Sequence, residues 1–217
     1  GSGGLGSRLA RAFLADGDYR VSVLSRIGSQ SEALDSLRLQ GASIAPVDYH
    51  QQDQLVKALQ GADILVCALD YVTAMELQPA LVQAAKAAGV RRIVPSDFSD
   101  ESAELHSLYS EDPGAIVRMA EELQLEYTRY YCGIFYCYAV APHVGMDVEN
   151  HKAIVVGKGN TSFSLVHRDD LARFVAASLK DPRSKNARFG FESGAVTPLE
   201  LVAAIEKHSG AKLAVSH

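Results

Sequence analysis

The first six residues form the pattern in this chain that points most directly to chemistry. Gly1-Ser2-Gly3-Gly4-Leu5-Gly6 is a Gly-x-Gly-x-x-Gly run. Glycines at this spacing let a backbone turn tightly against a pyrophosphate, whose charge then lies at the amino end of the following helix. The apolar spacing of Leu9 and Phe13 predicts that helix. The run therefore predicts a dinucleotide site, with a glycine-rich loop left by cloning as the alternative.

A cation follows at the distance that a dinucleotide site requires. Arg26 stands 20 positions after Gly6, just beyond a strand-like run over residues 19–24. In such a site this position meets the 2′ group of the adenosine ribose, where an acidic residue would favour NAD. Ser25 and Arg26 instead supply a hydroxyl and a cation, which suit a 2′-phosphate. We therefore predict NADP(H) rather than NAD, the alternative being a solvated surface arginine.

Apolar runs and helical patterns then alternate with short connections. This rhythm predicts an α/β fold, a Rossmann-like doubly wound parallel sheet covered by helices. The sequence predicts strands over residues 20–25, 43–47, 63–69, 91–95, 126–131 and 153–156, and helices up to 39 and over about 53–60, 74–88 and 114–123. Loops are expected to dominate between residues 132 and 152.

The last quarter of the chain changes character. Asp169 or Asp170 is predicted to cap a helix that runs to about Leu179. Thr197-Pro198-Leu199-Glu200 is a capping box with proline at the first helical position, and a strand is expected from Lys212. We predict a cofactor-binding domain over residues 1–150, with its first strand missing from this sequence. Residues 151–217 are predicted to form part of a substrate lobe that is interleaved with the last sheet elements and continues further in the natural protein.

Composition narrows the class of protein. Of the 217 residues, 47% are hydrophobic and 22% are charged, and the net charge is −5, which disfavours nucleic acid as a partner. No apolar stretch is long enough to cross a bilayer, so no membrane partner is predicted. Cys67, Cys132 and Cys137 follow no metal or disulfide spacing, so we predict no metal site and a reducing, cytoplasmic location. The sequence leaves the oligomeric state open.

An ordered set of motifs resembles a known family. Arg91-Arg92-Ile93-Val94-Pro95-Ser96-Asp97-Phe98, preceded by Ala84-Ala85-Lys86-Ala87-Ala88-Gly89-Val90, resembles the NmrA-like and isoflavone-reductase-like family of atypical short-chain dehydrogenases. Further matches in the same order are the glycine run, Ser25-Arg26, residues 61–66, Gln78, Glu126-Tyr127-Thr128, Gly133-Ile134-Phe135 and residues 166–175. The resemblance covers nearly the whole chain. It implies a Rossmann-like NADP-binding domain with a smaller substrate lobe, as in reductases of phenolic secondary metabolites and in non-catalytic dinucleotide sensors.

The resemblance also implies roles for individual residues. The pyrophosphate would lie on the glycine run, and the 2′-phosphate on Ser25 and Arg26. The implied cofactor residues are Gly1, Gly3, Gly4, Leu5, Gly6, Ser25, Arg26, Asp48, Tyr49, Ala68, Leu69, Ser96 and Phe98, and the implied substrate-pocket residues are Gly133 and Phe135. Three of these have structural alternatives: Asp48 as the cap of the next helix, and Phe98 and Phe135 as core residues.

The chain departs from the family at the expected proton donor. The reductases resemble one another in a lysine on the helix before the Tyr-Thr strand, but no lysine stands between Lys86 and Lys152 here. A positioned acid or base contributes about 10²–10⁴-fold to a rate. Arg118, on the predicted helix, does not replace it because guanidinium keeps its proton near neutral pH. The catalytic residue is therefore unknown, and the weak candidates are His106, Tyr130, Tyr131 and Asp97. The alternative for Asp97 is a position in a solvated loop. The alternative for one of the two tyrosines is a position in the core.

Together the residues and the resemblance predict an NADP(H)-dependent oxidoreductase that acts on a small aromatic or polycyclic metabolite. The absent lysine also allows proton-transfer or cyclisation chemistry without reduction. The alternative from another class is a non-catalytic NAD(P)-sensing regulatory protein, and a third interpretation is a structural remnant that binds no nucleotide.

Overall fold

The computed structural model describes residues 2–98 and 114–217, which divide into two compact units. The first unit runs to Tyr131 and takes in residues 172–189, and the second comprises residues 132–171 and 190–217. The chain passes from one unit to the other within three elements, β5 (Glu126–Cys132), α7 (Arg168–Ser178) and β10 (Ala187–Phe191). The assignment of a cofactor domain and a substrate lobe to parts of this chain stays a prediction.

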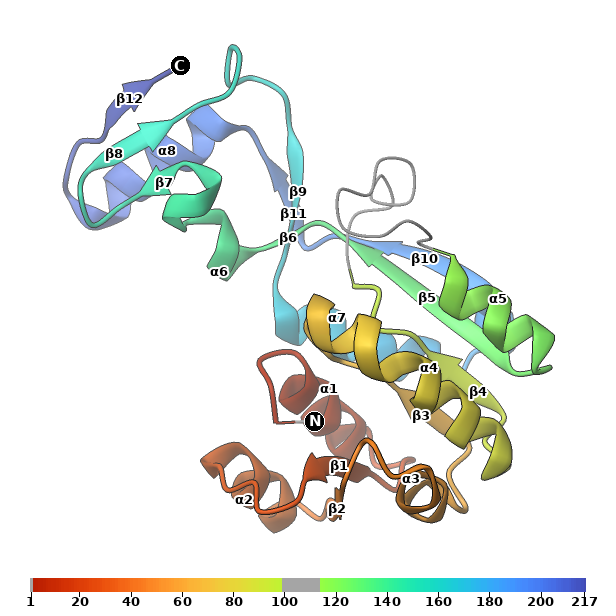
Figure 1. Cartoon of the computed structure of the whole chain (residues 1–217). Coiled ribbons are helices and arrows are strands. Elements are labelled where there is room, and N and C mark those ends of the chain that lie inside the picture. The colour runs from red at the N-terminus through yellow and green to blue at the C-terminus, as the bar shows by residue number, and fades with distance from the viewer. Residues whose placement is uncertain (1, 99–113) are drawn as a thin grey trace. The chain divides into compact units, whose positions relative to one another are not determined.

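The first unit alternates strands and helices (Figure 1). Besides β5, α7 and β10 it contains α1 (Gly6–Asp16), β1 (Ser22–Arg26), α2 (Glu32–Leu39), β2 (Ser43–Val47), α3 (Gln52–Leu59), β3 (Ile64–Val66), α4 (Tyr71–Ala87), β4 (Arg92–Val94), α5 (Ala115–Glu122) and the 3₁₀ helix η3 (Pro182–Ser184). β1 and β2 form a parallel pair, and a second sheet has the order β10-β5-β4-β3. β3, β4 and β5 are parallel. The predicted α/β class with parallel strands is confirmed.

Helices cover both faces of these strands. On one face, Leu55 of α3, Val82 of α4 and Ala120 of α5 join Ile93 of β4 in one buried cluster. On the other face, α1 and α2 pack on β1 through a cluster of Ala10, Val23, Leu34, Leu37 and Ala42. The Tyr19 hydroxyl donates to the carbonyl of Ala176, which ties α7 to the end of α1 at 2.7 Å. The strands of the first unit therefore lie between two layers of helices.

Local signals explain most helix ends. Ser31 caps α2 and Asp70 caps α4, in each case by accepting a backbone N–H three residues on. Because of the Asp70 cap, α4 begins at Tyr71, three residues before the predicted start. The predicted cap of α7 was wrong: Asp169 and Asp170 lie in its first turn, where carboxylates complement the helix dipole.

The second unit holds short strands and one long helix. Its elements, apart from the ends of β5, α7 and β10, are β6 (Ile134–Phe135), α6 (Tyr136–Ala139), η2 (Pro142–Val144), β7 (Met146–Asp147), β8 (Lys152–Ile154), β9 (Phe163–Val166), β11 (Gly194–Val196), α8 (Pro198–Ser209) and β12 (Ala214–Ser216). They form two sheets, in the orders β11-β9-β6 and β12-β8-β7. The expected loop between 132 and 152 is thus corrected to short strands and turns, which were too brief to produce a periodic signal.

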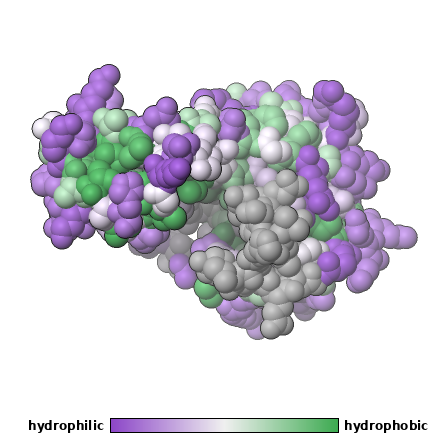
Figure 2. Space-filling view, turned by 90° about the horizontal axis from the view of Figure 1, so that it is seen from above, coloured by the Kyte–Doolittle hydropathy of each residue, from purple (hydrophilic) through white to green (hydrophobic). Residues whose placement is uncertain are grey.

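Packing and capping fix this unit. The predicted capping box of α8 is confirmed, since Thr197 and Glu200 bond each other's backbone N–H groups. A buried cluster that includes Met146, Val155, Leu165 and Leu201 forms the core. Figure 2 shows apolar surface on the left, on the second unit. In the described part of the chain, no helix is long and apolar enough to cross a membrane.

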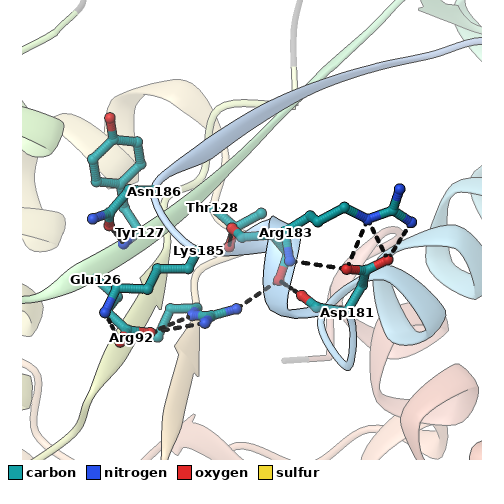
Figure 3. Close-up of polar contacts among 9 residues, drawn as sticks. Arg92, Glu126, Tyr127, Thr128, Asp181, Arg183, Lys185 and Asn186 are labelled. Atoms are coloured by element: carbon teal, nitrogen blue, oxygen red, sulfur yellow. Dashed lines mark hydrogen bonds and ion pairs between the residues drawn. The ribbon is translucent and has the colours of Figure 1, made fainter.

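A buried polar network joins the amino edge of the second sheet to the segment after α7 (Figure 3). At the start of β4, Arg92 donates to Glu126 Oε2 from Nε (3.0 Å) and Nη2 (2.8 Å), and to Ser184 Oγ from Nη1 (2.7 Å). Lys185 lies 2.9 Å from the other Glu126 oxygen. Burial alone raises the pKa of Glu126, but the hydrogen bonds from Lys185 and Arg92 hold it below its usual range.

Backbone contacts complete this network. Thr128 Oγ1 donates to the carbonyl of Ser184 at 2.7 Å, and Asn186 Oδ1 accepts from the Tyr127 N–H at 3.1 Å. The Ser184 hydroxyl in turn donates to the carbonyl of Asp181 at 2.7 Å. The segment from 181 to 186 is therefore fixed to the first residues of β4 and β5.

Candidate functional site

The candidate site is built at the carboxyl edge of the parallel strands of the first unit. The register pairs Arg26, the last residue of β1, with Val47, the last residue of β2, and pairs Val66 with Val94 at the ends of β3 and β4. Ligands of open α/β sheets bind at this edge. The ends of these four strands and the loops that follow them hold all the predicted cofactor residues outside the glycine segment.

The glycine segment leads directly into α1. Leu5 precedes the first helical residue, Gly6, and the Ser7 N–H donates to the carbonyl of Gly3 at 3.0 Å. Unlike α2, α4 and α8, this helix has no side-chain cap among the described residues, and its first turn holds no acidic residue. The first N–H groups of a helix lack partners within it and attract anions. The described part of the segment, Gly3 to Gly6, therefore suits a phosphate; Gly1 lies outside the described residues.

The ends of β1 and β2 lie together. Arg26 is exposed, whereas Ser25 is buried, so the cation is the accessible member of the predicted pair. Tyr49 is half-buried next to Cys67, and burial raises the pKa of its hydroxyl while the neighbouring Arg26 charge lowers it. Arg26, Tyr49 and the end of β3 thus form one neighbourhood.

Asp48 shapes its own turn instead of capping the next helix. Its carboxylate accepts from the His50 N–H at 3.0 Å, and its own N–H donates to Gln54 Oε1 at 3.0 Å. The residue preceding α3 is Gln51, so the structural alternative of Asp48 as a helix cap is wrong. Its predicted place beside the adenine stays a prediction.

Ser96 joins the ends of β3 and β4. Its hydroxyl accepts from the Leu69 N–H at 2.9 Å and donates to the Leu69 carbonyl at 2.8 Å. Its N–H donates to Oε1 of the buried Gln78 of α4 at 2.7 Å. These three bonds hold the loop after β3, which contains Ala68, against the loop after β4. Ser96 is therefore primarily a positioning group for two predicted cofactor loops.

An ion pair fixes the next residue. Arg129 of β5 is only 2% exposed, and its Nε donates to Asp97 Oδ2 at 2.7 Å while Nη2 contacts the same oxygen. The Arg129 guanidinium also lies 4.9 Å from the centre of the Tyr131 ring. Asp97 is thus tied to a buried cation, and this ion pair fixes the carboxylate beside β5.

An aromatic cluster lies beneath the same loop. Phe98 stacks on Tyr130 with ring centres 6.1 Å apart, and Tyr130 also contacts Phe174 and Phe189. The Tyr130 hydroxyl lies 2.8 Å from Ser178 Oγ, and burial raises its pKa to about 12. A phenol so buried and so weakly acidic is poorly matched to proton transfer near neutral pH. Tyr130 is therefore a packing residue that supports Phe98.

The remaining candidates do not assemble into a catalytic group within the described residues. Tyr131 is 6% exposed and lies against Arg129, and His106 lies outside the described residues. The sequence reasoning missed Arg129 and assigned no role to Gln78. Arginine in the middle of the run Glu126-Tyr127-Thr128-Arg129-Tyr130-Tyr131 was the available signal, because a charge in a buried strand needs a partner.

The two predicted substrate residues belong to the second unit. Gly133 lies between β5 and β6, and an added Cβ there would collide with the carbonyl of Ser164 in β9. The close approach of the backbone at residue 133 to β9 therefore requires glycine. Phe135 is half-buried rather than part of the core, and the Arg168 guanidinium lies 4.9 Å from the centre of its ring. The core alternative for Phe135 is therefore not what the structure shows.

Comparisons with solved structures agree with this architecture. The structure of AtPrR2 with NADP⁺ and (+)pinoresinol is 25% identical, with a TM-score of 0.80, over 100% of this chain and 76% of that one. A leucoanthocyanidin reductase–NADPH complex from Vitis vinifera, at 23% identity, has a TM-score of 0.85 over 99% of this chain and 74% of that one. The latter identity supports the fold alone.

Sequence comparisons point the same way. Pinoresinol reductase 1 of Arabidopsis thaliana is 31% identical over 98% of this chain and 73% of the relative, and oxidoreductase BOA1 of Botryotinia fuckeliana (strain B05.10) is 29% identical over 87% and 67%. The model of the NmrA-like family matches residues 1–217. Strand order, loop contacts and this match over the whole sequence lead to one conclusion: the chain belongs to the NmrA-like family.

Proposed function

We propose that this protein is an NADP(H)-dependent oxidoreductase that acts on a small aromatic or polycyclic metabolite. The observation that carries the proposal is the shared edge formed by the loops after β1, β2, β3 and β4, with the uncapped start of α1 in the same unit. A dinucleotide needs these features together: backbone donors for its pyrophosphate, a cation for its 2′-phosphate and a firm surface for its nicotinamide.

The chain's own residues supply the binding part of this function. Arg26 is exposed at the end of β1 and offers the charge-assisted hydrogen bonds that a phosphate prefers. Ser96, Gln78 and Leu69 fix the loops that would contact the nicotinamide ribose and ring. NADPH, when bound, supplies a hydride, and the protein orients it and excludes water. Relatives named as pinoresinol reductases support reduction of a phenolic substrate.

Arg26→Ala tests the cofactor assignment. We expect calorimetry to show that NADPH binds about tenfold or more weakly, since a charge-assisted hydrogen bond contributes about 1.5–3 kcal/mol. NADH, which lacks the 2′-phosphate, is expected to bind equally to both proteins. Arg38→Ala is the matched control, because Arg38 is also exposed but is paired with Asp35 on α2. Equal weakening of both nucleotides would contradict the phosphate role, and failure of all four pyridine nucleotides to bind would overturn the proposal.

A second candidate, a non-catalytic sensor of NAD(P), rests on the absence of lysine between Lys86 and Lys152. In a reductase of this family that lysine would donate a proton, and none of the described residues is favoured as a substitute for it. Incubation with NADPH and a panel of phenolic and indolic metabolites, followed by absorbance and product mass, separates the two. Product formation supports the enzyme, and tight nucleotide binding without any product supports the sensor.

A further inference from the structure

In the second unit, a guanidinium lies against two aromatic rings that also contact each other. Arg168 is the first residue of α7, and its Cζ lies 4.9 Å from the ring centre of Phe135 and 5.0 Å from that of Tyr138. The two rings are 6.1 Å apart and inclined at 55°. Stacking on aromatic faces restrains a guanidinium while its N–H groups, which lie in its own plane, remain directed outward.

Within residues 2–98 and 114–217, the guanidinium has no anionic partner. Its Nε is buried and makes no hydrogen bond with any described residue. The carboxylates adjacent in sequence have other contacts: Asp170 Oδ2 accepts from Ser193 Oγ at 2.9 Å, and Asp169 lies 3.8 Å from the His167 ring. Glu192, which follows β10, accepts from Ser164 at 2.6 Å. Among the described groups, the positive charge of Arg168 is therefore not neutralised by an ion pair.

The position makes this arrangement costly. A cation at the amino end of a helix opposes the helix dipole, and a buried donor without a partner lowers the stability of the fold. Aromatic stacking returns part of that cost. An acceptor that reached the guanidinium would remove the rest, and the planar edge of arginine fits a carboxylate through two parallel hydrogen bonds.

The surroundings favour a ligand that also carries an aromatic ring. Tyr136 and Tyr138 are 43% and 49% exposed, and the Tyr136 ring lies 6.3 Å from that of His167. Exposed aromatic faces offer stacking area to a flat ligand. Tyr138 covers the guanidinium, and its ring also lies 6.3 Å from that of His143. Because Tyr138 is 49% exposed, it is the side chain whose rotation would admit the ligand.

We propose that Arg168, which lies over the rings of Phe135 and Tyr138, binds the carboxylate of a small aromatic acid. This inference rests on the proposed function, because Phe135 is one of its predicted substrate residues, and it narrows the substrate class to compounds that carry both an aromatic ring and a carboxylate. The interaction is non-covalent, an ion pair with two hydrogen bonds from one edge of the guanidinium.

A pair of probes that differ only in charge tests the inference. We use 4-hydroxycinnamate and its methyl ester, each titrated by calorimetry into the full protein with NADPH present. The acid is expected to bind about tenfold more tightly than the ester, as one additional charge-assisted interaction predicts. In Arg168→Gln this preference is lost while the ester binds as before, and Arg168→Lys retains part of it. Arg183→Gln is the control, since Arg183 is an exposed arginine of the other unit.

Nuclear magnetic resonance of the arginine side chains gives a second readout on unaltered protein. The buried Nε–H of Arg168 is expected to shift on addition of the acid and not on addition of the ester. Equal binding of acid and ester, or an unmoved Nε–H signal at saturating acid, overturns the inference. NADPH titration of the same sample separates the two proposals: NADPH binding without discrimination between acid and ester refutes only this inference, and discrimination without NADPH binding refutes only the proposed cofactor function.

Discussion

Two buried arginine–carboxylate pairs lie at opposite edges of the same sheet, and they do different things. At the amino edge, Arg92 joins Glu126 and Ser184, so the start of β4 holds a segment that is 92 residues further along the chain. At the carboxyl edge, Arg129 joins Asp97 within the loop that contains Ser96 and Phe98. The first pair fixes a connection between elements, whereas the second fixes a loop that the proposed function assigns to the cofactor.

The surroundings of the two pairs explain the difference. The side chains of Arg92 and Glu126 are 6% and 16% exposed, and Lys185 also neutralises the carboxylate. Arg129 is buried more deeply, at 2%, but Asp97 is 25% exposed. The Arg92–Glu126 pair is mostly buried and contributes to the stability of the fold. The buried Arg129 holds the partly exposed Asp97 and can thereby position the loop that contains it. The same chemistry therefore serves structure at one edge and the candidate site at the other.

The largest expected effect is on stability at the amino edge. Arg92→Met leaves Glu126 with Lys185 as its remaining cation and leaves Ser184 without the Arg92 donor. We expect the free energy of unfolding to fall by about 3 kcal/mol, as when one partner of a buried pair is removed. Urea unfolding followed by circular dichroism measures it. NADPH affinity of the folded variant is expected to remain the same, because Arg92 lies at the start of β4 and the predicted cofactor loops follow the other ends of the strands.

The control for this variant is Arg38→Met. Its ion pair with Asp35 is 60% and 69% exposed, so its loss is expected to cost less than about 0.5 kcal/mol. A loss of stability in Arg92→Met no greater than in the control would mean that the amino-edge network does not hold the fold.

At the carboxyl edge, the effect on ligand binding is next in size. Arg129→Met frees Asp97 and the loop beside it, and we expect NADPH affinity to fall about tenfold, since loss of a positioned geometry weakens every contact made from it. Arg129→Lys keeps the charge without the planar fork and is expected to recover part of the affinity. Calorimetry is performed at a temperature at which circular dichroism shows both variants folded. Unchanged affinity in Arg129→Met would remove the distinction between the two edges.

The smallest effect is a change in pH dependence. Because the pKa of Glu126 is lowered in the folded protein, its ionised form stabilises the fold above the unfolded pKa of about 4.3. That stabilisation is lost as the pH falls through the lower, folded pKa. In Glu126→Gln we expect a lower free energy of unfolding near neutral pH and a shallower decline below about pH 5. Urea midpoints across this range measure the slope, with Glu122→Gln, an exposed carboxylate of α5, as control. Parallel curves for Glu126→Gln and the native protein would contradict the role of the ion pair.

Short-range signals in the sequence determined most elements of the first unit and their order. Alternating apolar periods predicted the parallel α/β fold, and the Thr197–Glu200 pattern predicted the start of α8 correctly. These features could be predicted because a helix cap or a buried strand depends on residues only a few positions apart. The family resemblance placed the predicted cofactor residues at or after the ends of successive strands, and parallel pairing then brought those strand ends together within each pair.

Only the tertiary structure decided which side chains meet. Arg129 reaches Asp97 across 32 positions, and Tyr130 turns its hydroxyl to Ser178 across 48, so neither partner is marked by local sequence. Tyr130 is a packing residue and Arg129 is a positioning cation. These roles follow from the face of β5 that each side chain occupies and from the residues that pack against that face. Burial makes a charge dependent on a precise partner, and that partner is supplied by folding distant segments together.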